Sequence, residues 1–185
     1  MRAGRKPDPL FFQKDECSMD FDKLTDAINT AVDGFEDSVL ACLEANHGVV
    51  EDIVHEQLYS GVDGNNNYLS PTYDDDPYFK TEKHSQWYKA WKERITPPIQ
   101  GEMLFLPPRP VEVPNLFIIG TFYDSIRTER TADSIHVYTG GFRDGPVIEK
   151  KYGEAIFMIG MSGKEYFNEH FLKDWILNYW KLCGL

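Results

Sequence analysis

The chain has 185 residues, 42% of them hydrophobic, and a formal net charge of −11 at pH 7. This length fits one domain with a hydrophobic core, and no stretch approaches the roughly 20 apolar residues needed to cross a bilayer. We therefore expect a soluble protein, made in the cytoplasm, without a membrane partner. The three cysteines, Cys17, Cys42 and Cys183, are odd in number and scattered, which argues against a disulfide framework.

The negative charge is concentrated in the N-terminal part of the chain. Residues 1–80 carry 17 acids and 6 bases, whereas residues 81–185 carry 13 of each. Direct DNA binding needs a basic contact surface, so we expect no sequence-specific nucleic-acid partner. The acidic part then serves either solubility alone or docking on a basic neighbour.

Residues 20–59 are predicted to be helical. Apolar residues recur there at steps of three and four: Phe21, Leu24, Ile28, Val32, Phe35, Val39 and Cys42 or Leu43. The Asn46-His47-Gly48 break predicts two helices or one long bent helix, starting at a cap from Asp20 or Ser18. Residues 1–19 form an N-terminal arm in this interpretation, and residues 20–185 form a single domain.

A long loop, a short helix and an extended arm are predicted next. Residues 60–80 are rich in Gly, Asn, Asp and Pro, which indicates a loop. Residues 81–95 predict a helix with Trp87, Tyr88, Trp91 and Ile95 on one face, and with Lys89, Lys92 and Arg94 pointing away from it. Residues 97–114 hold six of the eleven prolines, which predicts an extended Pro-rich arm.

The last third of the chain predicts a small sheet and a terminal helix. Residues 116–119 predict a short buried strand or extended segment, and residues 125–131 and 134–139 predict a β-hairpin with its turn at Ala132-Asp133. Helical turns are expected over 147–152. An amphipathic C-terminal helix should begin at a Ser162 cap, with Glu165 completing a capping box. The expected fold class is therefore α+β, with long N-terminal helices and a small antiparallel sheet.

The search for chemistry gives few candidates. Asp63, Asn65 and Asp74 match part of the spacing of an EF-hand loop, but Tyr68 stands where that loop requires Gly. A turn built from Gly and Asn explains the same residues, so we expect no metal and no cofactor. Asp74-Asp75-Asp76 suit a divalent cation, a basic partner or simple solvation. Because metalloprotease, serine-hydrolase and P-loop motifs are missing, we expect no catalytic residues and a protein that is not an enzyme.

Three blocks of sequence carry a family resemblance. The segment Pro114-Asn115-Leu116-Phe117-Ile118-Ile119-Gly120-Thr121-Phe122-Tyr123-Asp124-Ser125-Ile126 resembles a "PNLxxxGxFYxSI" segment of small virion structural proteins from tailed phages of Bacteroides-type gut bacteria, the crAss-like group included. Residues 56–63 with 69–73 look like their "QLYxGxD…xxYSPxY" block. Residues 148–153 with 156–160 are similar to an "xEKKYGxxIFGL" block.

The resemblance implies a non-enzymatic virion protein of the neck, head–tail connector or tail-completion type. Its partners would be copies of itself in a homo-oligomeric ring and the neighbouring portal, neck or tail proteins, and its location would be the virion. As packing or interface residues we select Trp87, Trp91, Phe122, Tyr123 and Tyr152, and as an electrostatic contact the Asp74, Asp75 and Asp76 loop. The alternative is a free acidic interaction protein, an inhibitor or nucleic-acid mimic that binds a basic host surface.

Overall fold

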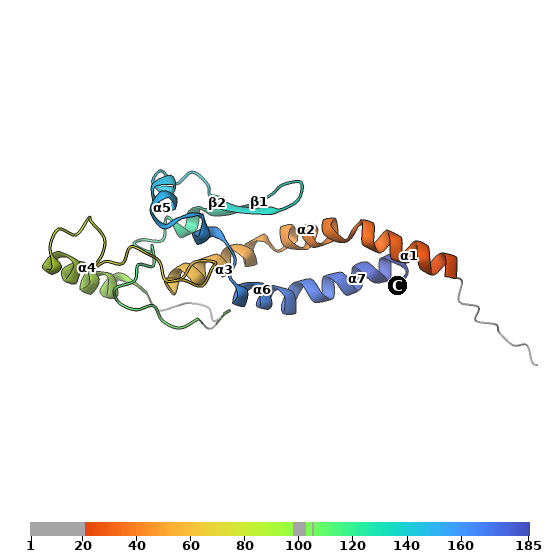
Figure 1. Cartoon of the computed structure of the whole chain (residues 1–185), viewed down its shortest axis with the longest axis horizontal. Helices are drawn as coiled ribbons and strands as arrows, with labels where there is room; N and C mark the ends of the chain where they lie inside the picture. The colour runs from red at the N-terminus through yellow and green to blue at the C-terminus, as the bar shows by residue number, and fades with distance from the viewer. Residues whose placement is uncertain (1–20, 98–102, 105) are drawn as a thin grey trace, which may run out of the picture.

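The protein is elongated, with a helical arm at one end and a transverse helix at the other (Figure 1). The computed structural model describes residues 21–97, 103, 104 and 106–185, so the predicted N-terminal arm lies outside the described residues. The elements are α1 (Phe21–Asp33), α2 (Phe35–Ala45), α3 (His47–Tyr59), α4 (Glu82–Ile95), η1 (Tyr123–Ser125), β1 (Ile126–Arg130), β2 (Ile135–Thr139), α5 (Gly145–Tyr152), η2 (Glu154–Phe157), α6 (Met161–Phe167), η3 (Asn168–Leu172) and α7 (Lys173–Cys183). The fold class is α+β, as the sequence predicted.

The N-terminal helical region contains three helices rather than one or two. The predicted break lies at Asn46, whose side-chain amide donates to the carbonyl of Cys42 at 2.8 Å. A second break, at Gly34, was not predicted. A Cβ at Gly34 would lie 2.4 Å from the hydroxyl of Tyr179, so glycine lets α7 approach the junction between α1 and α2.

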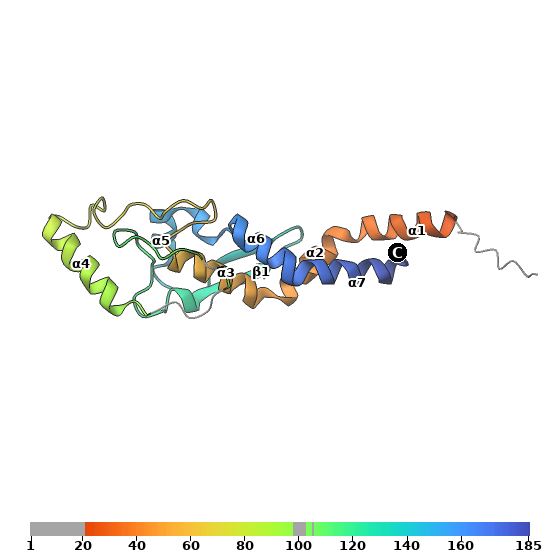
Figure 2. The ribbon, with the colours of Figure 1, turned by 90° about the horizontal axis from the view of Figure 1, so that it is seen from below.

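The C-terminal helix returns along α2 and α1 (Figures 1 and 2). It runs continuously through α6, the π-helical turn η3 and α7. The Ser162 cap was a wrong prediction, because the helix begins at Met161 and follows Gly160 without a side-chain cap. The hydroxyl of Tyr179 donates to the carbonyls of Thr30 and Ala31, and this contact fixes α7 against α1.

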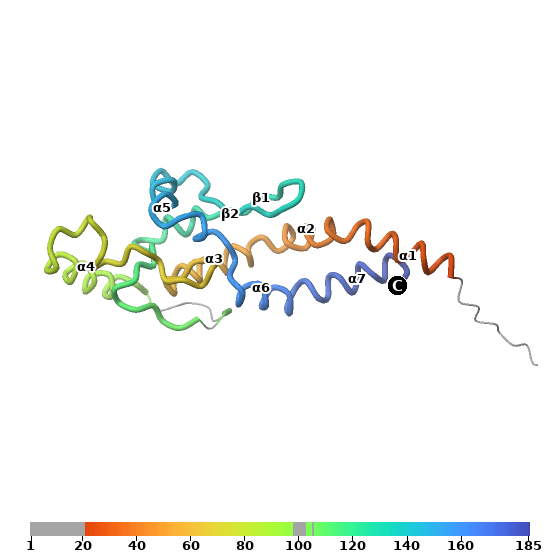
Figure 3. The backbone as a smooth tube through the Cα atoms, viewed as in Figure 1, coloured from red at the N-terminus to blue at the C-terminus, as the bar shows by residue number. Residues whose placement is uncertain are grey.

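The core lies around α3, in the middle of the molecule. Val50, Ile53, Val54 and Leu58 of this helix are fully buried against the hairpin, η2 and α6. The side chain of Gln57 adds a polar link, because its amide donates to the carbonyl of Met158 at 2.9 Å and accepts from the backbone amide of Gly160 at 2.7 Å. The tube in Figure 3 shows how α3 and α6 meet at this point.

The β-hairpin was predicted correctly. β1 and β2 pair antiparallel, with Ile126 opposite Thr139 and Arg130 opposite Ile135. The hairpin is attached to the N-terminal helices by side chains. Glu51 accepts from the backbone amide of Thr128 at 3.0 Å, and Arg130 forms ion pairs with Asp37 and Glu44.

The predicted strand over 116–119 is absent, and this is a correction. Leu116 has a positive φ of 56°, and the side chain of Ile119 is 77% exposed. The polar Asn115, directly before this segment, is buried, and its carbonyl accepts from the hydroxyl of Tyr123 at 2.6 Å. The segment is therefore anchored by hydrogen bonds rather than by strand pairing.

Candidate interaction surfaces

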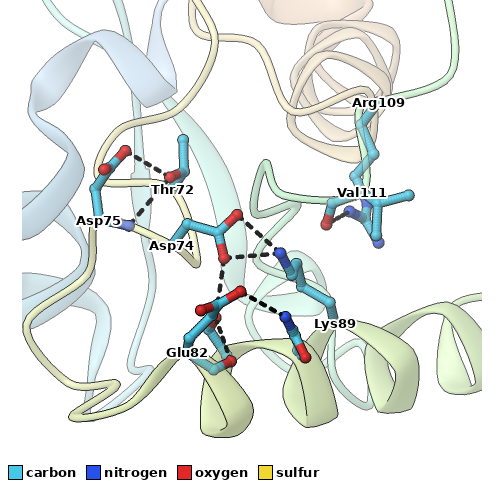
Figure 4. Close-up of polar contacts among 9 residues, drawn as sticks. Thr72, Asp74, Asp75, Glu82, Lys89, Arg109 and Val111 are labelled. Atoms are coloured by element: carbon cyan, nitrogen blue, oxygen red, sulfur yellow. Dashed lines mark hydrogen bonds and ion pairs between the residues drawn. The ribbon is translucent and has the colours of Figure 1, made fainter.

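The Asp74 loop lies against α4 and is fixed to it by polar contacts (Figure 4). Thr81 caps α4, and its hydroxyl accepts from the backbone amide of His84. The ammonium of Lys89 donates to both carboxylate oxygens of Asp74, at 2.7 and 2.8 Å, and the hydroxyl of Ser85 donates to one of them at 2.9 Å. These hydrogen bonds lower the pKa of Asp74. Asp74 therefore holds the loop on the helix.

The three consecutive carboxylates occupy different environments. Asp76 is buried and forms an ion pair with Lys151 of α5, which corrects its prediction as a surface contact. Asp75 is exposed and accepts from the hydroxyl of Thr72 at 2.7 Å. Of the three, only Asp75 has no ion-pair partner in the described part of the chain. Of the three carboxylates, Asp75 is therefore the one available for an electrostatic contact with another molecule.

The candidate metal ligands Asp63, Asn65 and Asp74 do not come together around one point. Asp63 accepts from the backbone amides of Asn65 and Asn67, both at 2.9 Å, and so closes its own turn. Asp74, as described above, is bound to Lys89. Among residues 21–97, 103, 104 and 106–185, no three His, Cys, Asp or Glu side chains are grouped to hold an ion.

The exposed face of α4 differs from the predicted one. Lys92, expected to point outward, is 1% exposed, whereas Trp87, expected on the packed face, is 63% exposed. Tyr88 and Trp91 do pack, with ring centroids 5.2 Å apart. Trp87 therefore stands as an uncovered indole on the transverse helix at this end of the molecule.

Lys92 donates to the backbone carbonyl of Phe117 and so fastens α4 to the segment that follows the Pro-rich arm. Burial and, to a smaller extent, the nearby Arg109 guanidinium lower the pKa of this lysine to about 7. Arg109 is itself used locally, donating to the carbonyls of Pro110, Val111 and Val113. Figure 4 shows it beside Val111.

Phe122 and Tyr123 belong to the core, so of the two predicted roles, packing or interface, the structure shows packing. Their rings pack at 6.2 Å with each other, and Tyr123 packs on His55 at 5.2 Å. Tyr152 is half-buried at the end of α5, and burial raises its pKa to about 12. Of the five aromatic candidates, Trp87 is the one that is mainly exposed.

A second uncovered surface lies at the opposite end of the molecule, and the sequence did not predict it. Apolar side chains of α1, α2 and α7 line an open groove of about 610 Å³: Ile28, Ala31, Val32, Phe35, Trp180 and Leu185, together with Asp33 and Glu36. Val32 is 68% exposed. The groove residues Ile28, Val32 and Phe35 belong to the apolar stripe that begins at Phe21, but a stripe does not show whether another element covers it.

This groove has an acidic border. The segment 21–45 holds six acids and a single base, a net charge of −5. On α1, Asp22 and Asp33 follow the stripe residues Phe21 and Val32 by one position, which places them about 100° further around the helix axis. Within the described residues, Asp33 and Glu36 form no ion pair. The groove therefore offers apolar area beside uncompensated negative charge.

No known protein family, curated protein or solved structure matches the chain. In the part of the chain that the structure describes, no helix combines the length and the apolar character that a membrane crossing requires.

Proposed function

We propose that this protein is a non-enzymatic structural component of a tailed-phage virion. In this proposal it assembles through protein contacts as a connector or tail-completion ring at the neck. The family resemblance of the Pro114–Ile126 segment and of the two flanking blocks supports the type of particle. The single observation that supports assembly is that the protomer, which is elongated (Figure 1), exposes an apolar groove at one end and the indole of Trp87 at the other.

Two different surfaces at opposite ends are what a head-to-tail contact requires. Such contacts close into a ring when the rotation between neighbours divides a full turn. The groove near Val32 is one such surface and the α4 face that presents Trp87 is another, and each can bind a different part of a neighbouring copy. Exposed Trp is enriched among the residues that dominate interface energies, because it buries a large area with little loss of side-chain freedom.

Native mass spectrometry of the purified protein and peptide mapping of purified virions test the proposal together. We expect ring-sized oligomers, and several copies of the protein per particle. Trp87→Ala should reduce the oligomer, whereas Tyr68→Ala, which removes another exposed aromatic ring, should leave it intact. Absence of the protein from virions would refute the virion assignment, and a monomer at all concentrations would refute the ring.

The acidic border of the groove favours a second candidate, a free acidic protein that binds a basic host surface. Surface charges act mainly on association rate and lose their effect as salt screens them. A salt-sensitive complex between the isolated protein and a host protein, with no copies in virions, would favour this candidate over the structural one.

A further inference from the structure

We propose that the acidic groove of α1, α2 and α7 is the docking site for the N-terminal segment, residues 2–12, of a neighbouring copy. The inference rests on the proposed self-assembly and names the contact that produces it. It starts from an apolar groove that no described segment covers.

The segment has the chemistry that the groove requires. It begins with three cations, Arg2, Arg5 and Lys6, and continues into the apolar run Leu10-Phe11-Phe12. Residues 1–12 have a net charge of +2, whereas residues 21–45 have a net charge of −5. Two phenylalanines and a leucine can cover the apolar floor, and the cations can lie beside Asp33 and Glu36.

Charge also favours the N-terminal segment over the groove of a second copy as the occupant of this groove. Two identical grooves placed face to face would bring Asp33 and Glu36 against the same acids of the partner, and like charges in contact oppose association. Residues 2–12 combine three cations with the apolar run Leu10-Phe11-Phe12, which follows Pro7-Asp8-Pro9. Docking of this cationic segment therefore avoids the repulsion that direct contact between two acidic grooves would produce.

The length of the chain allows the exchange. Residues 13–20 join the segment to Phe21 and can span about 26–29 Å when extended. Val32 in the groove lies eleven residues into α1 from Phe21, about 16 Å along the axis. Because α1 runs from the tip of the molecule toward the core, docking in the same chain requires a reversal before Phe21, whereas docking in a copy that lies beyond the tip requires none.

A synthetic peptide of residues 1–14 tests the docking. The acceptor is the full chain carrying Phe11→Ser and Phe12→Ser, which leaves its groove free of its own segment. We expect the labelled peptide to bind, and binding to weaken at least about tenfold when Arg2, Arg5 and Lys6 of the peptide are changed to Glu. Val32→Lys in the acceptor should weaken binding by a similar factor. Val147→Lys, at a valine of similar exposure on α5, should not.

The mass of the unmodified chain tests the exchange between copies. We expect an oligomer that an excess of the peptide dissociates and that the Phe11→Ser, Phe12→Ser chain does not form. If the peptide binds the acceptor but the unmodified chain is a monomer, the segment docks within one chain and the exchange is overturned. A peptide that does not bind, or that binds Val32→Lys unchanged, would overturn the docking. Detection of the protein in virions would still support the proposed function in either case.

Discussion

The buried lysine of α4 makes the stability of this protein depend on pH in a defined direction. In the folded chain the pKa of Lys92 is lowered to about 7, whereas in the unfolded chain it has its ordinary value near 10.5. Between these values the unfolded state binds a proton that the folded state does not. The free energy of unfolding therefore rises with pH across this window, by about 1.4 kcal/mol per pH unit.

The measurable part of this window ends near pH 9. Burial raises the pKa of Cys42, Tyr73 and Tyr152, so these groups lose protons more easily in the unfolded state and reduce stability at higher pH. Between pH 7.5 and 9.0 we expect the free energy of unfolding to rise by about 2 kcal/mol. Urea unfolding at fixed ionic strength, followed by circular dichroism, measures this rise.

Lys92→Met isolates the contribution of the buried amine. The variant keeps the length of the side chain, lacks the titrating group, and leaves the carbonyl of Phe117 without its donor, at a cost of about 1–3 kcal/mol. Its stability should not rise over pH 7.5–9.0, whereas Lys150→Met, at an exposed lysine of α5, should keep the rise of the unmodified protein. A flat profile in the unmodified chain, or the same rise in Lys92→Met, would refute the reasoning.

Two further substitutions test the packing around the core, each with a matched control and each read from urea unfolding. Gly163→Ala should destabilise by about 1–3 kcal/mol because its Cβ would lie 2.4 Å from a core side chain. Gly48→Ala, with nothing within 4 Å, should stabilise by about 0.5–1 kcal/mol, and equal effects at the two sites would contradict the described helix packing. Tyr123→Phe should destabilise by about 1–3 kcal/mol because it leaves the buried carbonyl of Asn115 unpaired. Tyr68→Phe, at an exposed ring, should change stability by less than about 0.5 kcal/mol, and a loss of similar size there would exclude this explanation.

Hydrophobic periodicity predicted where α4 begins and ends, but not which face it buries. Thr81 and the apolar spacing located the helix correctly. Trp87 is exposed and Lys92 is buried, which is the reverse of the prediction. Both side chains are long and amphipathic, so either can lie along apolar surface. The backbone carbonyl of Phe117, which accepts from Lys92, decides the rotation, and it comes from a segment distant in sequence. The apolar spacing within α4 does not reveal a contact with a residue so distant in sequence.

The uncovered groove escaped prediction for a related reason. The stripe that contains Ile28 and Val32 is typical of a helix face packed on a core, and a periodic pattern does not say whether a neighbour is present. In the structure α1 extends beyond the core, and among the described helices it contacts chiefly α7 and α2. The hairpin and α5, in contrast, depend on local turns, which explains why the sequence predicted both.

Because α1 lies beyond the core, the free energy of local unfolding should be lower for α1 than for the central helix α3. Ala31 is the buried residue of this helix, whereas α3 contributes five buried residues to the centre of the molecule. Local unfolding of α1 therefore exposes little apolar area, and its amides should exchange with solvent hydrogen well before those of α3. A ligand that orders α1 would stabilise this tip with little effect on the exchange of the core. The helical arm can thus gain rigidity on binding while the remainder of the protein keeps its dynamics unchanged.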